Sequence, residues 1–483
     1  MFHVAALVSS FLHSEDLTFA QDNTDVLWIK CSDPQDEFHY LFTRFYDRLR
    51  IIHQTLEGCG QDNFVPCVGI LEMFHRLTTR FHAAVTKHRG LNLLIRFATK
   101  RSTLENLRNF HGFLDKLSQN LELKNEWRKT WKQDCDQMYK VYEDKVKKPQ
   151  LAIIGLPNAE VAEILAILKF EWEYNKHKLT EKEAELLWKT TNKAARSSGV
   201  KIPKISAFYI PSVDVELESN FDVVSGCTLS RGVYDHETRL VAQYLSADDR
   251  YARQLFWCAT EIWHGFEHPN VAKIVGESLV CCKPCVLWEE ASAQGTFIHY
   301  FAGEQQNNRK RLWRMFLQVA RGLHYIHHQG GTHGNLKCSH ILVTADDTPK
   351  ICHFELCKGS GGAIDPWKGP EYNLGTGLDP SKPGDVYSFG LCIIEARTGD
   401  IPYGTSDDDY VTSQLQKEFD CYPRPQVGTE GCEFDNDEWK VVERFVAHNP
   451  TDRPTMAQAI EMIEELAWKE AMKEMKLLPA STR

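Results

Sequence analysis

The sequence predicts an α+β fold class, in which an all-α helical bundle precedes a larger domain of mixed structure. Two observations lead to this prediction. Apolar residues recur at steps of three and four over residues 38–142, as amphipathic helices require. Beyond residue 210, distinctive short motifs follow one another, and the longest is HGNLKCSHILVTADDTPKICHFE at 333–355. The predicted parts are a helical bundle at 35–148, a helical connector at 149–210 and a second domain at 215–475.

Four apolar stripes predict four helices in the first part of the chain. Each stripe places its residues on one face of a helix, and short connections between such helices favour a bundle. The stripes are Phe38, Leu41, Phe45, Leu49, Ile52 and Leu56; Ile70, Phe74, Leu77, Phe81 and Val85; Leu104, Leu107, His111, Leu114, Leu117 and Leu121; and Trp127, Trp131, Cys135, Met138 and Tyr142.

The connector shows two further helices. Val161, Ile164, Leu165, Leu168 and Trp172 form one apolar stripe. Thr180 and Glu183 have the spacing of a capping box, which predicts the start of the second helix. Ser197-Ser198-Gly199 predicts its end, and the following residues are typical of an extended segment that leads into the first strand.

Composition is that of a globular protein, with 42% hydrophobic and 25% charged residues among 483. No run of 18 apolar residues occurs, and the first residues lack the basic region of a signal peptide. The 15 cysteines have no repeating frame, which is typical of reduced thiols. We therefore expect a cytoplasmic protein.

The motif at 333–355 resembles the catalytic loop and metal-binding segment of a protein kinase, HRDLKxxNIL…KIxDFG. The resemblance is to the tyrosine-kinase-like group, and in particular to the mixed-lineage kinase-domain-like pseudokinases. It implies a bilobal fold with a small β-rich N-lobe and a helical C-lobe. Further kinase landmarks occur in the expected order: VARGLHYIHHQGG at 319–331 lies upstream, and GPE at 369–371, DVYSFG at 385–390 and DRPT at 452–455 lie downstream. TGDIPYG at 398–404 is similar to the mixed-lineage kinase-domain-like pseudokinases.

The resemblance also shows that the residues of kinase chemistry have been replaced. The catalytic Asp of the family falls on Asn335, and its two metal-binding residues fall on His340 and His353. Phosphoryl transfer needs an acceptor for the substrate hydroxyl proton and hard oxygen ligands for magnesium. An amide and two imidazoles supply neither, so we expect a kinase fold without kinase activity and without a metal. Because the family's residues at 340 and 353 share one magnesium ion, we expect these two rings to approach each other.

The nucleotide-binding half shows the same loss. The phosphate-pairing Lys of the family's third strand aligns with Tyr244, and its Glu partner aligns with Ala259. The glycine-rich loop has Asp222, Val224 and Cys227 at its glycine positions. Bare backbone must approach phosphate closely, so these side chains disfavour ATP. The residues left in the cleft are Gly226, Trp288, Glu289, Ala291 and Lys337.

Three residues outside this chemistry are expected to hold the fold. Glu371 and Arg453 correspond to residues that form a buried ion pair in kinases, and Asp385 opens the DVYSFG motif. All three remain here although the catalytic residues do not. We therefore expect the helical lobe to be intact. We expect no cofactor, although weak ATP binding without magnesium stays open.

The sequence favours a pseudokinase that acts as a signalling scaffold or conformational switch through protein binding. The expected partners are signalling proteins, among them an active kinase. One alternative is an atypical active serine/threonine protein kinase, since Lys337 remains. A second is a membrane-acting executor released by the pseudokinase domain. Residues 76–148 carry seventeen Lys/Arg against eight Asp/Glu, which leaves contact with anionic lipid open. The chain is acidic overall and has no nucleic-acid-binding motif, so nucleic acid is not an expected partner.

Overall fold

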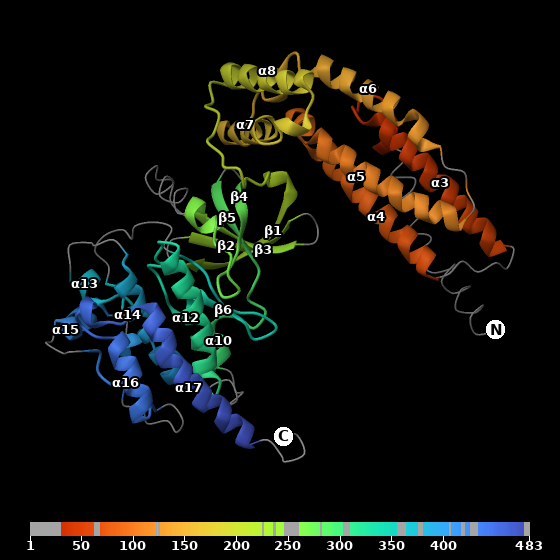
Figure 1. Cartoon of the computed structure of the whole chain (residues 1–483). Coiled ribbons are helices and arrows are strands. Elements are labelled where there is room, and N and C mark those ends of the chain that lie inside the picture. Colours follow the sequence, from red (N-terminus) through yellow and green to blue (C-terminus); the bar gives the residue numbers. More distant parts are fainter. Residues whose placement is uncertain are drawn as a thin grey trace. The chain divides into compact units, whose positions relative to one another are not determined.

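The computed structural model describes two compact units, which divide between Ala207 and Phe208 (Figure 1). The described residues are 30–61, 68–121, 123, 126–224, 227–234, 238–245, 260–280, 283–302, 310–354, 364–374, 380–404, 407–416, 421–425 and 433–477. Both lobes that the kinase resemblance implies lie in the second unit. The fold class is α+β, as predicted. Among these residues, no helix is long and apolar enough to cross a membrane.

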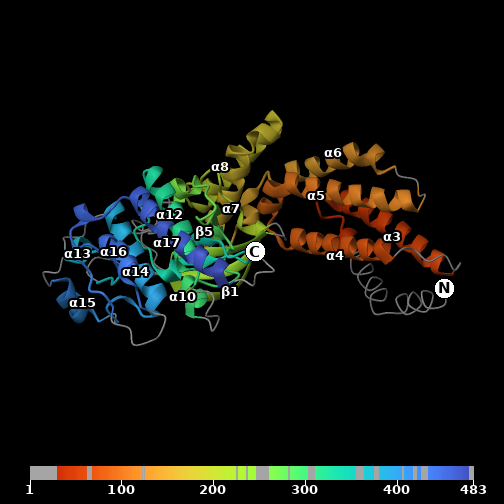
Figure 2. The same cartoon turned by 60° about the horizontal axis from the view of Figure 1, so that its bottom comes forward.

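In the described part of the first unit, four helices from α3 onward lie side by side (Figures 1 and 2). They are α3 (His39–Gln61), α4 (Val68–Gly90), α5 (Leu93–Asn120) and α6 (Trp127–Lys145). The predicted stripes face the core between them. Phe45, Phe81, Leu114 and Tyr142, one from each helix, are buried. Trp127, at the start of α6, is only half-buried. It stacks on His111 with 4.2 Å between ring centroids.

Two more helices complete the first unit. Helix α7 (Asn158–Glu173) packs against α5, and α8 (Glu181–Ser198) packs against α7. The capping box at Thr180 and Glu183 is present, with the Thr180 side chain accepting from the Glu183 N–H. Gly199 ends α8 with φ +72°, a backbone conformation that favours glycine. These contacts place the helices of the predicted connector in the same unit as the bundle.

The second unit opens with a five-stranded antiparallel sheet in the order β1-β2-β3-β5-β4. The strands are β1 (Val215–Val224), β2 (Cys227–Tyr234), β3 (Thr238–Leu245), β4 (Ile274–Val280) and β5 (Lys283–Glu289). Alternate residues point to opposite faces. On β3, Val241 packs into the large core that includes the helical lobe, whereas Leu240 and Ala242 pack into a smaller core on the other face.

The helical lobe surrounds α14 (Lys382–Thr398), which is buried from Asp385 to Ala396. Helices α12 and α17 lie side by side, as Figures 1 and 2 show. The short strands β6 and β7 form a hairpin that carries the residues of the kinase-like motif. The remaining bounds are α10 (Phe297–Ala302), α12 (Leu312–His328), β6 (Ile341–Val343), β7 (Pro349–Ile351), α13 (Pro370–Asn373), α15 (Asp408–Leu415), α16 (Asn436–Phe445) and α17 (Met456–Leu477).

Candidate functional site

The loop that corresponds to the kinase catalytic loop is held at its start by Asp385. One carboxylate oxygen of Asp385 accepts the backbone N–H of His333, and the other accepts that of Gly334, both at 2.8 Å. The Nε2 atom of His327 also lies 2.8 Å from this carboxylate. Gly334 adopts φ +74°, so the loop turns sharply at that point. Asp385 therefore has the structural role that the sequence predicted, and His327 is a partner that the sequence did not identify.

His333 joins this loop to the residue that directly follows β7. Its Nε2 donates to the carbonyl oxygen of Cys352 at 2.9 Å, and its Nδ1 accepts the backbone N–H of Asn335 at 3.1 Å. Complete burial lowers the pKa of His333 to about 4. The ring is therefore neutral at pH 7, with one nitrogen donating and the other accepting. Such a ring fixes the loop but carries no charge into the site.

Aromatic rings connect this loop to the sheet. The Phe354 ring stacks on Trp263 with 4.6 Å between centroids and on Trp288 with 5.8 Å, and it lies 4.8 Å from the His333 ring. All four side chains are buried. Trp263 was not identified from the sequence, where the signal was a tryptophan five residues before His268. The stack fills the space behind the motif with apolar surface.

The three positions that lack kinase chemistry lie together. The rings of His340 and His353 are 5.2 Å apart at an interplanar angle of 86°, which confirms the predicted approach. The Nδ1 atom of His340 lies 2.6 Å from the carbonyl oxygen of Asn335. Since a carbonyl oxygen only accepts, Nδ1 carries the proton. Burial, and then the neighbouring His353, hold the pKa of His340 well below its usual value, so that this imidazole is neutral.

These side chains do not fit the magnesium ion that kinase chemistry uses. Magnesium takes octahedral oxygen ligands, usually one or two carboxylates together with water and phosphate. At the two metal-binding positions this chain has a buried neutral imidazole and a second imidazole at φ +55°. Asn335 is buried as well, and its amide cannot take up a proton as a carboxylate does. We therefore derive no phosphoryl-transfer step at this site.

Lys337 is the cation that the catalytic loop retains, and other groups engage it. Its Nζ lies 3.0 Å from Oδ2 of Asp365 and 4.7 Å from the ring centroid of Trp367. The Trp367 indole N–H in turn donates to the buried carboxylate of Glu395 at 2.7 Å. A cation paired with a carboxylate and placed over an aromatic face is stabilised there. Binding a nucleotide phosphate would require Lys337 to leave both contacts.

The structure corrects the prediction for the phosphate-pairing position on β3. Tyr244 packs with the smaller core on the outer face of the sheet, so it does not point toward the cleft. Gln243 points inward and its Oε1 accepts the indole N–H of Trp288 at 2.9 Å. A shift of one residue along a strand moves every side chain to the other face. Gln243 is therefore the neutral residue that β3 presents to the cleft.

The remaining predicted cleft residues are partly described. Trp288 is buried at the rear, between Gln243 and the Phe354 ring. Ala291 is buried just beyond β5. Glu289 is engaged by the backbone N–H of Lys273 at 2.8 Å and by Nζ of Lys350 at 2.7 Å. Gly226 and Ala259 lie outside the described residues.

The predicted ion pair between Glu371 and Arg453 is present. The two terminal guanidinium nitrogens of Arg453 lie 2.7 and 2.9 Å from the two carboxylate oxygens of Glu371. The Arg453 side chain is fully buried, and that of Glu371 is 20% exposed. Arg453 also donates to the carbonyl oxygens of Ala447, Pro383 and His448. The pair joins α13 to the segment that precedes α17.

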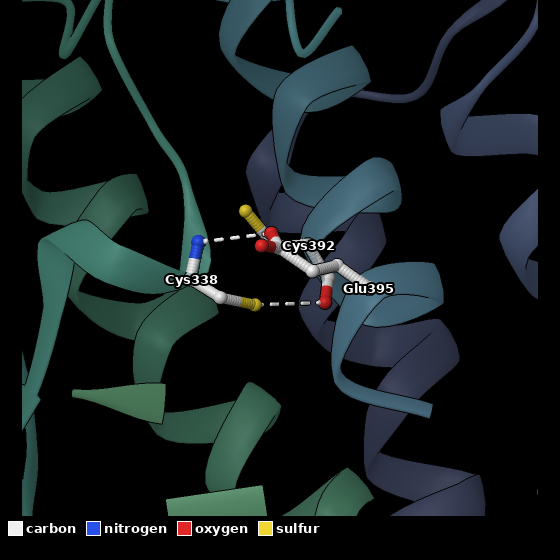
Figure 3. Close-up of side chains that lie close together, drawn as sticks. All are labelled: Cys338, Cys392 and Glu395. Carbon is white, nitrogen blue, oxygen red and sulfur yellow. Dashed lines mark hydrogen bonds between the residues drawn. The ribbon is translucent and has the colours of Figure 1, made fainter. Parts of the chain in front are cut away.

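Three buried side chains behind the catalytic loop have the types that could ligate a metal: Cys338, Cys392 and Glu395. Figure 3 shows that Cys338 makes hydrogen bonds to the other two residues. The Cys338 thiol lies 3.2 Å from the carbonyl oxygen of Cys392, and its backbone N–H donates to Glu395 at 3.2 Å. Burial raises the pKa values of both thiols and of Glu395. We interpret this cluster as a structural contact between the loop and α14.

Comparison with known proteins agrees with the kinase-like motifs of the second unit. A family model described as protein tyrosine and serine/threonine kinase matches residues 218–463, which is just over half of the chain. A protein named "Probable inactive receptor kinase" from Arabidopsis thaliana is 30% identical over 173 residues, 32% of this chain and 26% of that protein. Serine/threonine-protein kinase CTR1 from the same organism is 25% identical over 282 residues, 53% of this chain and 32% of CTR1.

A human relative, lymphokine-activated killer T-cell-originated protein kinase, is 29% identical over 178 residues, 31% of this chain and 54% of that protein. The chain thus spans from about a quarter to about half of the length of these three relatives. The match falls on the second unit, which contains the antiparallel sheet, the catalytic-loop frame and the Glu371–Arg453 pair. This chain belongs to the protein tyrosine and serine/threonine kinase family.

Proposed function

We propose that this chain is a pseudokinase of the tyrosine-kinase-like group, similar to the mixed-lineage kinase-domain-like pseudokinases. The observation that carries the proposal is the cluster of Asn335, His340 and His353. In it, an amide occupies the position of the family's catalytic Asp, and two imidazoles occupy the positions of its metal ligands. His340 is buried and neutral, so the cluster has neither the charge nor the oxygen ligands that magnesium requires.

Three further observations support the loss of nucleotide chemistry. Lys337 is paired with Asp365, and β3 presents Gln243 to the cleft instead of a cation. Trp288 fills the rear of the cleft, where an adenine ring would need space. We therefore propose that the protein uses no magnesium-ATP and works through its surfaces. It acts in the cytoplasm as a signalling scaffold or conformational switch that binds signalling proteins, including an active kinase.

Purified full-length chain, magnesium and ATP test the first part of this proposal. We expect no transfer of phosphate to the chain or to a general protein substrate. We also expect no melting shift with 1 mM magnesium-ATP, because the cleft should not bind it. A ligand that did bind, present at 100 times its dissociation constant, would add about 2.7 kcal/mol to the free energy of unfolding and raise the melting temperature. The matched control is Asn335→Ala. Transfer by the wild type that disappears in Asn335→Ala would establish the alternative, an atypical active serine/threonine kinase.

The second alternative is a membrane-acting executor in which residues 76–148 bind anionic lipid. Several cations of this segment are paired within the first unit, which reduces their availability to lipid. Arg101 pairs with Glu171 at 2.9 Å, and Arg128 pairs with Asp115 at 2.6 Å. Leakage of phosphatidylserine vesicles caused by the full-length chain would favour this alternative over the scaffold.

A further inference from the structure

The helical unit contains a second cluster of side chains that could ligate a metal, far along the chain from the kinase-like cleft. Asp36 and Glu37 lie just before α3, and His88 lies in the last turn of α4. One ligand atom from each lies within 4.8 Å of the others. The three residues are 6%, 2% and 4% exposed. Two adjacent carboxylates and an imidazole are thus gathered in the interior of the bundle.

Several polar atoms of this cluster have no hydrogen-bond partner among the residues that the structure describes. They are Oδ2 of Asp36, Oε2 of Glu37 and both ring nitrogens of His88. Native proteins pair most buried polar atoms, and exceptions often mark a bound ion or water. The Cys338, Cys392 and Glu395 cluster differs on this point, because hydrogen bonds within the protein engage it.

Arg96, the cation next to the unpaired carboxylate oxygens, makes no short hydrogen bond to them. Nη1 of Arg96 lies 3.3 Å from Oε2 of Glu37 and 3.8 Å from Oδ2 of Asp36. Charge-assisted N–H···O bonds are normally about 2.7–2.9 Å long. His88 Nε2 is likewise 3.5 Å from Oδ1 of Asp36. All three contacts are therefore longer than a charge-assisted hydrogen bond, and the unpaired atoms keep the capacity to bind a ligand.

The other oxygen of each carboxylate is already engaged, which leaves the unpaired one for a ligand. Oδ1 of Asp36 accepts the backbone N–H of Phe38 at 2.8 Å, and Oε1 of Glu37 pairs with Nζ of Lys145 at 2.6 Å. Arg96 and Lys145 balance the two carboxylates. Because their side chains are 17% and 34% exposed, water screens part of their charge. A dication at the unpaired oxygens therefore meets two positive charges that are partly screened by water.

We propose that Asp36, Glu37 and His88 bind one transition-metal dication, with zinc the best fit. An imidazole and two carboxylates are a ligand set that zinc accepts, usually with a water in the fourth position. Metal–ligand bonds of about 2.0–2.1 Å in a tetrahedron place ligand atoms about 3.3–3.4 Å apart. The candidate ligand atoms of the three residues lie within 4.8 Å of one another, so a modest inward shift of their side chains would reach that spacing. The ion would tie the turn before α3 to the end of α4.

The test uses the full-length chain, treated with EDTA and then dialysed against zinc. We expect one zinc per chain by inductively coupled plasma mass spectrometry. Calorimetric titration with zinc chloride should give a binding isotherm that Glu37→Gln and His88→Ala each weaken at least tenfold. Cobalt(II) substitution should give visible absorption bands in the wild type and not in His88→Ala.

The matched control is Asp33→Asn, which removes a neighbouring carboxylate that pairs with Arg89 at 2.6 Å outside the cluster. It should bind zinc as the wild type does. Glu37→Gln keeps the size of the side chain, and circular dichroism of the metal-free variants shows whether they fold. The proposal is overturned if the wild type takes up no stoichiometric zinc, as for a cluster that holds only water. Zinc retained in folded Glu37→Gln or His88→Ala overturns it as well.

Discussion

At the scale of single residues, the cleft keeps the hydrogen bonds that hold a catalytic loop, while other residue types occupy the catalytic and metal-binding positions. Asp385 and His333 still fix the backbone of the loop. His340 donates its Nδ1 proton to the Asn335 carbonyl and is buried without a charge. A buried carboxylate would need a cation or several donors to offset its desolvation. The neutral ring needs one hydrogen bond, which the Asn335 carbonyl oxygen provides.

The pairing of Trp288 with Gln243 leads to a prediction about strand register. We expect Trp288→Phe to lower the free energy of unfolding by about 2 kcal/mol, since it leaves the buried Gln243 carbonyl oxygen without its donor. Adding Gln243→Leu removes that unpaired group, so the double variant should lose less than the sum of the two single variants. Urea unfolding measures all three.

Trp468→Phe is the matched control, because Trp468 is largely exposed and should change stability little. Strict additivity between Trp288→Phe and Gln243→Leu would contradict the contact. It would return Tyr244 to consideration as the residue that faces the cleft.

A buried lysine in the helical unit gives a prediction for pH. Burial lowers the pKa of Lys100 to about 8, although Glu183 and Glu171 act in the opposite direction. Its Nζ makes a long contact of 3.4 Å with the Phe97 carbonyl oxygen and lies 4.6 Å from the centroid of the Phe97 ring. The folded state therefore disfavours the charged form. A depressed lysine pKa costs stability in full below pH 8, and the cost disappears as pH rises from about 8 to the unfolded value.

Lys100→Met should therefore raise the melting temperature at pH 7, where the charge costs about 3 kcal/mol. The gain should shrink between pH 8 and pH 10, because the wild type then loses its proton. Differential scanning calorimetry at both pH values measures this. Lys132→Met, at an exposed lysine of α6, should show little effect at either pH. A gain for Lys100→Met that is equal at pH 7 and pH 10 would argue against a buried charge.

At the scale of elements, long-range polar contacts hold residues 365–371 in place. Asp365 pairs with Lys337 of the loop, and Trp367 donates to Glu395 on α14. Glu371 on α13 pairs with Arg453 before α17. Each contact joins an irregular segment to a helix or loop that the core holds in place. These joints stabilise the helical lobe independently of nucleotide chemistry.

The Glu371–Arg453 joint predicts a large effect of a single change. Glu371→Ala should lower the free energy of unfolding by about 3 kcal/mol, since it leaves a fully buried guanidinium without its carboxylate. Glu371→Gln should cost less, because an amide oxygen still accepts one hydrogen bond. Chemical denaturation followed by tryptophan fluorescence measures both.

Glu464→Ala is the control for Glu371→Ala. Glu464 pairs with Arg321 at 3.1 Å, but both side chains are about half exposed, so the pair contributes little. If the two alanine variants unfolded at the same denaturant concentration, the Glu371–Arg453 pair would not be the joint that we describe.

At the scale of the whole molecule, the chain combines a helical unit and a kinase-family unit, each with its own core. The core of the first unit comes from the stripes of α3 to α6, and that of the second surrounds α12 and α14. Each unit has the size of a domain that can fold by itself. The units can therefore be examined by changes that are confined to one of them.

We expect residues 208–483 expressed alone to be folded, with a cooperative thermal transition by circular dichroism. In the full-length chain, Glu371→Ala should move the transition that this fragment shows, and Lys100→Met should move a different one. A fragment that lacks a cooperative transition would contradict the division between Ala207 and Phe208.

Local patterns in the sequence determined the elements and much of the cleft. Apolar periodicity identified the helices of the bundle, and Thr180 with Glu183 marked the start of α8. The register from His333 to Phe354 contains no gap, so the family resemblance could be carried onto His340 and His353 and predicted their approach. The Glu371–Arg453 pair followed from the family resemblance as well.

Tertiary structure decided what no local pattern encodes. A strand that is apolar on both faces has no internal mark of its register, so only packing showed that Gln243 faces inward and Tyr244 outward. The ion pair between Lys337 and Asp365 depends on the fold that brings residue 365 close to the catalytic loop. Asp36, Glu37 and His88 likewise meet only when α3 and α4 pack together, because their spacing in the sequence matches no metal motif. Contacts between residues distant in sequence depend on the path of the whole chain, and periodicity describes only neighbours.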